Sequence, residues 1–179
     1  MQFVIFEKYV IWINSKLVGR IWVGYTVSIL LLWLTKEVIL VGTVDIDFTK
    51  YSALAVEDDA GGMAIIGVMM RYMGLQSYMN ATGEGVVELA LAMKPRPNII
   101  FLDLNLPKTN GYEIIKKIRA ESRLKDVLVI AVTAQDADEE IPRCMEAGFD
   151  GFIGKPISRT RFPRQLRRIL MGDPVWETY

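Results

Sequence analysis

The sequence contains no histidine and a single cysteine, Cys144, and these shortages exclude several kinds of site. Without histidine the chain cannot supply a Ser-His-Asp triad, a histidine general base or a histidine-ligated zinc ion. One cysteine excludes an internal disulfide and is typical of a reducing compartment. We therefore expect a cytoplasmic protein whose functional site is built from other side chains.

The chain also lacks net charge, because 21 basic residues balance 21 acidic ones. Without a basic excess nothing draws it toward nucleic acid or an anionic membrane, so we expect no direct nucleic acid binding. Hydrophobic residues make up 51% of the 179 positions, which is enough to fill a core. The length is that of one ordinary domain with some chain left over.

A hydrophobic run long enough to span a bilayer is missing from residues 1–50, although this segment is strongly apolar. Residues 21–34 are a stretch of 14 residues without charge that lies between Arg20 and Lys36. A spanning helix needs about 20 residues. Residues 21–41 would therefore anchor the chain only if charged side chains entered the membrane.

The charges around this stretch also argue against an anchor. Lys8, Lys16 and Arg20 precede it, and the positive-inside rule would then export the rest of the chain. We expect residues 1–50 to be an apolar extension, or the product of a start codon assigned too far upstream. A membrane-tethered interaction module remains the competing interpretation.

From residue 51 the pattern becomes regular. It predicts strands at 52–57, 75–80, 98–103, 127–133 and 150–154, and helices at 60–73, 83–93, 110–121, 137–147 and 158–170. Alternating strands and helices indicate an α/β fold with a parallel sheet, and the third and fourth strands are apolar throughout, as expected when helices cover both faces. The predicted domain covers residues 51–172, and residues 173–179 form a tail.

Polar residues follow several of these strands. Glu57 and Asp58 lie where the first strand ends, Asp103 lies at the end of the third, Thr133 ends the fourth, and Lys155 lies just beyond the fifth. Because the carboxyl ends of parallel strands share one edge of the sheet, we expect these side chains to form one site.

The chemistry of this set points to phosphoryl transfer. Three clustered carboxylates repel one another unless a cation lies between them. Oxygen ligands without His or Cys favour a hard ion, and we expect Mg²⁺. A lysine and a threonine hydroxyl would neutralise and bind phosphoryl oxygens, and a carboxylate can act as the nucleophile, which gives an aspartyl phosphate.

Residues 52–170 resemble the receiver domain of two-component response regulators, the CheY-like superfamily. The motifs are "AVEDD", "FLDLNLPKTNG", "VTA" and "GFDGFIGKPIS". The intervals are similar too: Asp103 lies 30 residues before Thr133, 49 before Phe152 and 52 before Lys155. The resemblance implies a doubly wound, flavodoxin-like sheet of five parallel strands in the order 2-1-3-4-5, with five helices.

The resemblance also implies roles for the acidic residues. Asp103 is similar to the phosphorylated aspartate. Asp58 resembles the direct Mg²⁺ ligand, Glu57 its partner acting through a metal-bound water, and Asn105 the residue whose backbone carbonyl binds the metal. "EDD" leaves a second register open, but the family pattern favours Glu57 and Asp58, and Asp59 would then cap the first helix.

Three further residues take roles from the resemblance. Lys155 is similar to the lysine that contacts the phosphate, and its bond to Pro156 is expected to be cis. Thr133, a second phosphate contact, and Phe152 resemble the switch pair that rearranges on phosphorylation.

The expected partners also follow from the family. They are a histidine kinase or histidine phosphotransferase, and a downstream protein that binds the face formed by helix 137–147, strand 150–154 and helix 158–170. This face often forms homodimers through charge pairs, here between arginines of the last helix and acids at the start of helix 137–147. The resemblance is to a stand-alone receiver that is not an enzyme beyond its own phosphotransfer and autodephosphorylation.

One enzymatic alternative uses the same nucleophile. Phosphatases of the haloacid dehalogenase type also combine a strand-end aspartate with Mg²⁺, but they need an acid two positions later, where this chain has Asn105. A further departure is Pro163, which should kink the last helix or delay its start.

Overall fold

The computed structural model describes residues 4–6, 9–11 and 46–177, and the chain separates into two compact units, Met1–Asp45 and Ile46–Tyr179. In the first unit, β1 (Val4–Phe6) and β2 (Tyr9–Ile11) pair antiparallel. The apolar stretch at 21–41 lies outside the described residues. Among the residues that are described, no helix has the length and hydropathy needed to cross a membrane.

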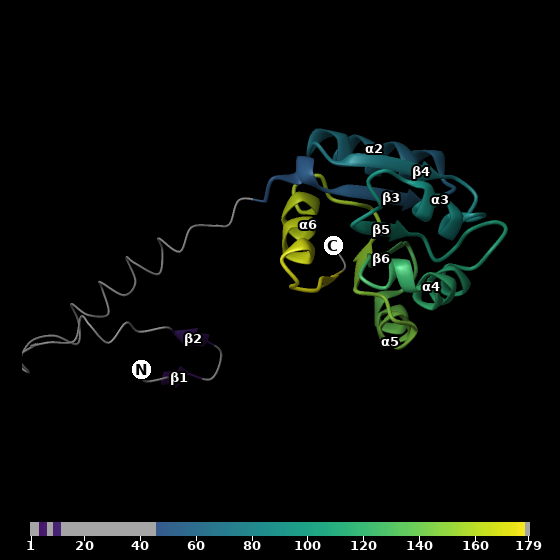
Figure 1. Ribbon diagram of the computed structural model, residues 1–179. Coiled ribbons are helices and arrows are strands. Elements are labelled where there is room, and N and C mark those ends of the chain that lie inside the picture. The colour runs from purple at the N-terminus through teal and green to yellow at the C-terminus, as the bar shows by residue number, and fades with distance from the viewer. Residues whose placement is uncertain (1–3, 7–8, 12–45, 178–179) are drawn as a thin grey trace, which may run out of the picture. The chain divides into compact units, whose positions relative to one another are not determined.

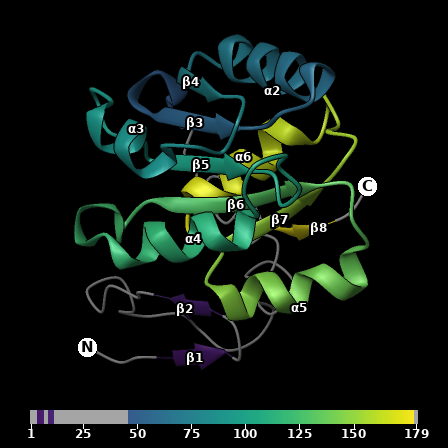
Figure 2. The same ribbon diagram turned by 90° about the vertical axis from the view of Figure 1, so that its right-hand side faces the viewer.

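The second unit is built on a six-stranded parallel sheet with the order β4-β3-β5-β6-β7-β8 (Figures 1 and 2). Its strands are β3 (Ser52–Val56), β4 (Gln76–Asn80), β5 (Ile99–Leu102), β6 (Leu128–Thr133), β7 (Gly151–Gly154) and β8 (Trp176–Glu177). The first five strands confirm the predicted order 2-1-3-4-5.

The sixth strand corrects the predicted count of five. β8 lies within the segment that we expected to be a tail, and it pairs parallel with β7. The Phe152 N–H donates to the Val175 carbonyl at 2.6 Å, and a Cβ on Gly151 would lie 2.7 Å from that same carbonyl oxygen. A glycine in β7 therefore permits the close approach. Two residues are too few to show a strand period, which is why the sequence pattern missed β8.

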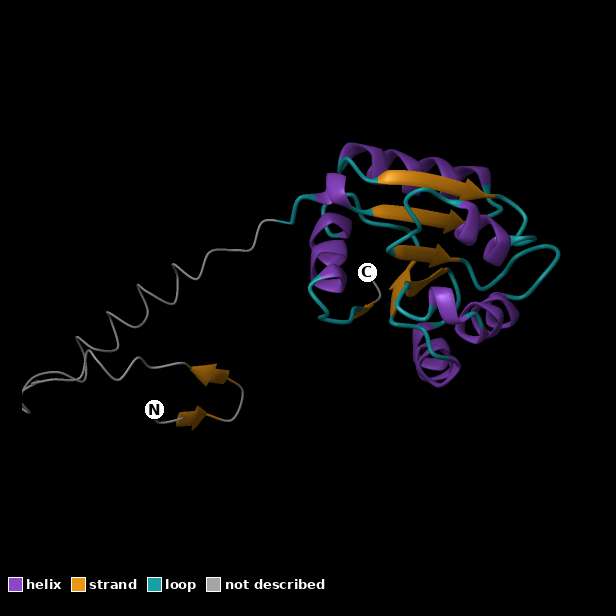
Figure 3. Cartoon of the chain, in the orientation of Figure 1, coloured by secondary structure: helices purple, strands orange, loops and turns teal. Residues whose placement is uncertain are grey.

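Among the described residues, five α-helices cover the two faces of the sheet, as can be followed in Figure 3. They are α2 (Ala60–Tyr72), α3 (Val86–Ala92), α4 (Gly111–Ala120), α5 (Ala137–Ala147) and α6 (Phe162–Leu170), with short 3-10 turns at Phe48–Lys50 and Ser122–Leu124. Side chains from α2 and α6 form one hydrophobic cluster with the sheet, and side chains from α3, α4 and α5 form the other. β5 is buried along its whole length, as its apolar sequence predicts.

Local chemistry sets where the helices begin. Asp59 caps α2, as predicted, because its side chain accepts a hydrogen bond from the Gly62 N–H at 2.7 Å. α6 begins at Phe162 rather than at 158, because Pro163 is suited to the first turn of a helix and not to its interior. α3 begins at 86 rather than at 83, since the preceding loop contains Gly85 with φ of 64°.

Candidate functional site

Three acidic side chains meet at the carboxyl edge of the sheet. Glu57 and Asp58 follow β3, and Asp103 follows the neighbouring strand β5. A carboxylate oxygen from each lies within 4.8 Å of those of the other two. Glu57 and Asp103 are only 3% and 6% exposed, whereas Asp58 is open to solvent. The structure therefore brings the predicted acids together, with one of them accessible from outside.

Lys155 joins two of these acids. Its Nζ lies 2.6 Å from Asp103 Oδ2 and 2.7 Å from Glu57 Oε2. Its backbone N–H donates to the Thr133 carbonyl at 2.8 Å, which fixes the start of the loop after β7. The following bond to Pro156 is cis, as the resemblance implied. The fold thus brings Lys155 into contact with acids that lie far from it in the sequence.

Burial and ion pairing act in opposite directions on these groups. Burial raises the pKa of the Glu57 carboxyl, and the hydrogen bond from Lys155 only partly offsets it. For Lys155, burial by itself lowers the pKa, but the hydrogen bonds to Asp103 and Glu57 together outweigh it, and the pKa is raised. Lys155 therefore remains an ammonium group that can hold a negatively charged ligand.

The loop after β5 is held tightly around Asp103. The Asn105 N–H donates to Asp103 Oδ1 at 3.1 Å, and Asn105 also bridges to Asn110 across the loop. A Cβ on Gly111 would lie 2.7 Å from the Asp103 carbonyl oxygen and 2.8 Å from the Leu104 Cα. The glycine at this position therefore allows α4 to begin directly against the loop.

The two expected switch residues lie on neighbouring strands. Thr133 ends β6, Phe152 lies in β7, and both are fully buried. The Thr133 hydroxyl accepts a hydrogen bond from the Gln135 N–H at 3.3 Å. The Gln135 side chain in turn donates from Nε2 to Asn105 Oδ1 at 3.1 Å, which links the loops after β5 and β6. The sequence analysis did not identify Gln135 as part of this site. The only feature of the sequence that pointed to it is its position two residues after Thr133.

The donor set suits a hard divalent cation. The three acids offer only oxygen ligands, which Mg²⁺ prefers, and two of them are held in fixed positions by burial. A Cβ on Gly62 would lie 2.7 Å from the Glu57 carboxyl carbon, so the glycine leaves room for that carboxylate. The residues present therefore fit a magnesium ion.

The family model described as the response regulator receiver domain matches residues 53–167, which is more than half of the chain. This chain belongs to the response regulator receiver family. It is a receiver domain of the two-component type, a class of signalling domains that are generally not enzymes.

Relatives of this receiver include two-component response regulators from a plant and a bacterium. The response regulator ORR5 of Oryza sativa subsp. japonica is 31% identical over 117 residues, which cover 65% of this chain and 87% of ORR5. The polar-differentiation response regulator DivK of Brucella anthropi is 34% identical over 124 residues, which cover 68% of this chain and 97% of DivK.

Solved structures of receivers are also similar. The receiver domain of sensor histidine kinase PA1611 from Pseudomonas aeruginosa PAO1, which has a magnesium ion coordinated in its active-site cleft, is 29% identical with a TM-score of 0.60. That match covers 68% of this chain and 98% of the PA1611 domain. The chemotaxis response regulator CheY4 of Vibrio cholerae has a TM-score of 0.61 at 23% identity, covers 66% of this chain and 98% of CheY4, and supports the fold alone.

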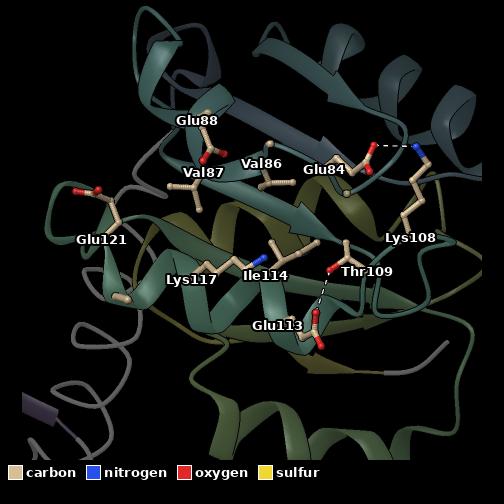
Figure 4. Close-up of a pocket in the computed structure, with 13 residues that line it drawn as sticks. Glu84, Val86, Val87, Glu88, Lys108, Thr109, Glu113, Ile114, Lys117 and Glu121 are labelled. Carbon is tan, nitrogen blue, oxygen red and sulfur yellow. Dashed lines mark hydrogen bonds and ion pairs between the residues drawn. The ribbon is translucent and has the colours of Figure 1, made fainter.

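The receiver also has a groove that is separate from the acid cluster. It lies between α3 and α4, has a volume of ≈ 670 Å³ and includes neither Glu57 nor Asp103 in its lining. Figure 4 shows Lys108 paired with Glu84 and the Thr109 hydroxyl bonded to Glu113 at its rim. Its charged residues are mostly paired with one another or solvated, so we assign no ligand to it.

Proposed function

We propose that this receiver accepts a phosphoryl group on Asp103 from a histidine kinase or histidine phosphotransferase and signals by binding a protein partner. The observation that carries the proposal is Lys155, whose ammonium lies 2.6 Å from Asp103 in a site where three carboxylates meet. A single lysine against three acids leaves an excess of negative charge that a cation would offset.

The transfer step needs only one nucleophile. An Asp103 carboxylate oxygen attacks the phosphorus of phosphohistidine, a phosphorus–oxygen bond forms, and the phosphorus–nitrogen bond of the donor breaks. The product is an acyl phosphate on Asp103, and the donor imidazole leaves neutral because its other ring nitrogen already carries a proton. Lys155 would neutralise one phosphoryl oxygen, and the Thr133 hydroxyl would donate to another.

We propose that Asp58, Glu57, Asp103 and the Asn105 backbone carbonyl hold Mg²⁺. When bound, the ion supplies charge neutralisation for the phosphoryl oxygens. Asp58 is the exposed member of the cluster and the natural direct ligand, while the buried Glu57 already accepts hydrogen bonds from Lys155. This division supports the expectation that Glu57 acts through a bound water.

A hollow lies beside Lys155, the residue whose Nζ contacts Asp103. It has a volume of ≈ 360 Å³ and is lined by the start of α2 and by Ala134, Pro156 and Ile157. Its lining is mainly apolar, so a partner that presents a phosphohistidine there could exclude water from the transfer.

We propose that the output face is the one formed by α5, β7 and α6. β8 lies along β7 and adds Trp176 to this face. One of the arginines assigned to charge pairing is engaged within the chain, because Arg168 pairs with Asp173 and Glu177. The charge pattern that a partner meets on α6 therefore differs from the one that the sequence suggested.

Phosphorylation by acetyl phosphate tests the proposal. The parent protein should gain an acid-labile phosphate only when Mg²⁺ is present, and Asp103→Asn should gain none. Asp59→Asn is the matched control, since it removes one nearby acid and keeps an N-capping side chain. Labelling of Asp103→Asn at another residue, or equal labelling without Mg²⁺, would contradict the assignment.

A further inference from the structure

The two edges of the sheet differ in how they are protected. β8 at one edge has only two residues, begins two positions after Pro174 and ends on Glu177. Short length, a nearby proline and charge are features that protect an edge from pairing. β4 at the other edge has five residues, Gln76–Asn80, with neither charge nor proline. Figures 1 and 2 show β4 as the outermost strand beyond β3. An edge of this kind is a template for another strand.

The backbone groups that β4 leaves free can be identified. The Gln76 N–H donates to the Tyr51 carbonyl at 3.1 Å, and the Asn80 carbonyl accepts from the Glu57 N–H at 3.1 Å, so these residues face β3. Hydrogen-bonding groups alternate in direction along a strand. Ser77 and Met79 therefore turn their N–H and C=O groups away from the sheet.

We propose that β4 pairs with β4 of a second copy of this chain, antiparallel about a two-fold axis at Tyr78. In this register Ser77 lies opposite Met79 of the second copy, and an antiparallel pair joins opposed residues through outward-facing groups of this kind. Gln76 lies opposite Asn80 of the second copy, and Tyr78 meets its own equivalent. A two-fold interface must be self-complementary, and this strand satisfies that condition.

β4 itself carries no charge that would lie opposite a like charge in a second copy. Tyr78 is 39% exposed and Met79 is 36% exposed, and the neighbouring helix α2 contains a single charged residue, Arg71. Met79 lies toward α2, because a Cβ on Gly67 would come within 2.6 Å of its methyl group. Tyr78 points to the opposite face of the sheet, where two rings related by the axis would form a cross-strand aromatic pair.

The length of β4 limits the area that the two copies can bury against each other. Five residues extend over about 17 Å, so the contact is smaller than the ~800 Å² per partner of a stable interface. We therefore expect a weak, reversible dimer, as is typical of transient contacts of small area. The inference does not depend on phosphorylation, so Asp103→Asn should dimerise like the parent protein.

Charge substitutions at the two-fold position test both the contact and its register. In a dimer of Tyr78→Lys, or of Tyr78→Glu, two like charges would face each other across the two-fold axis. Analytical ultracentrifugation should then show that self-association is weakened by at least about tenfold. A mixture of the two variants should form a heterodimer, because lysine then faces glutamate. Tyr78→Phe is the matched control and should dimerise like the parent, and circular dichroism should show that all variants are folded.

Amide hydrogen exchange in the parent protein gives an independent test. The amides of Ser77 and Met79 should become protected as protein concentration rises, whereas the Tyr78 amide, which faces β3, should not change. A parent that stays monomeric at high concentration, charged variants that associate as the parent does, or a mixture without heterodimers would each overturn the proposal. The proposal would also be overturned if a strand of another protein bound to this edge while the receiver showed no self-association.

Discussion

Thr133 connects the proposed phosphorylation site to the neighbouring strand β7. Its side chain is fully buried, and its hydroxyl accepts a hydrogen bond from the Gln135 N–H, while its carbonyl accepts one from the Lys155 N–H. Its backbone pairs with Gly154, two residues beyond Phe152. A movement of the Thr133 hydroxyl can therefore be transmitted to β7 through the backbone pairing of Thr133 with Gly154.

We expect Thr133→Ala to accept phosphate on Asp103 but to respond weakly to it. The hydroxyl is the group that would bind a phosphoryl oxygen, and without it phosphorylation loses a contact that differs between the two states. The coupling should fall by about 1–3 kcal/mol, the usual size of such effects. Hydrogen exchange of the β7 amides, with and without acetyl phosphate, measures the response.

Thr133→Ser is the control for this variant, since serine keeps the hydroxyl and removes only a methyl group. It should retain most of the response in β7. If the alanine variant changes its exchange on phosphorylation as much as the parent does, the hydroxyl is not the coupling group.

At the scale of elements, α4 and α5 are joined by a buried polar contact. Tyr112 on α4 donates its hydroxyl to Glu140 on α5, and Arg143 pairs with the same carboxylate. Glu140 is only 3% exposed, and the guanidinium of Arg143 lies 5.0 Å from the centre of the Tyr112 ring. This arrangement fixes α5, a helix of the proposed output face, against its neighbour.

Tyr112→Phe should destabilise the fold by about 1–3 kcal/mol, because it leaves a buried carboxylate oxygen without its donor. Burial, followed by the hydrogen bond to Glu140, raises the pKa of Tyr112 above its ordinary value of 10.0. A raised pKa means that the contribution of Tyr112 is fully present below pH 10 and is lost as the pH rises further. Urea unfolding at neutral and alkaline pH should therefore show that the gap between parent and variant narrows above pH 10.

A double-mutant cycle with Glu140→Gln separates this contact from the loss of packing. The two substitutions should be non-additive, since glutamine keeps an acceptor oxygen but removes the charge that strengthens the hydrogen bond from Tyr112. Additive effects, or a gap that is constant with pH, would show that the hydroxyl contributes nothing specific.

β8 is an edge strand that pairs with β7 alone and is also held by ion pairs to α6. Arg168 on α6 pairs with Asp173 and Glu177, which lie on either side of the strand's first residue. These side chains are partly exposed, so Arg168→Ala should lower global stability by no more than about 1 kcal/mol. It should nevertheless release β8, and the Phe152 amide, which donates to Val175, should exchange faster.

Arg159→Ala is the matched control for β8, because Arg159 is exposed and precedes α6. Its amide exchange pattern should match that of the parent. Unchanged protection of Phe152 in Arg168→Ala would show that the backbone ladder alone holds the strand.

For the whole molecule, the sequence predicted most of the sheet because the buried strands β3, β5 and β6 have clear apolar patterns and recognisable helices lie between the strands. It also predicted the acid cluster, since strand ends in a parallel sheet share one edge. It could not predict β8, which has no period, or the burial of Glu140, which depends on how α4 and α5 pack. The link from Gln135 to Asn105 depends on loop conformations that residue types alone do not set.

Magnesium should stabilise the folded receiver as a whole. The folded chain brings three carboxylates within 4.8 Å and the unfolded chain does not, so an ion that binds this cluster shifts the equilibrium toward the folded state. Above the dissociation constant, each tenfold rise in Mg²⁺ should add about 1.4 kcal/mol to the free energy of unfolding. Urea unfolding at a series of Mg²⁺ concentrations measures this slope.

Two adjacent acids provide the comparison that decides which of them binds the ion. Asp58→Asn and Asp59→Asn remove the same charge one residue apart, and both positions are exposed. Asp59 caps α2 through the Gly62 N–H, a bond that asparagine can also accept. We expect the dependence on Mg²⁺ to be largely lost in Asp58→Asn and retained in Asp59→Asn. The reverse result would assign the metal to the second register of the "EDD" motif, and an equal loss in both would mean that the ion responds only to total charge.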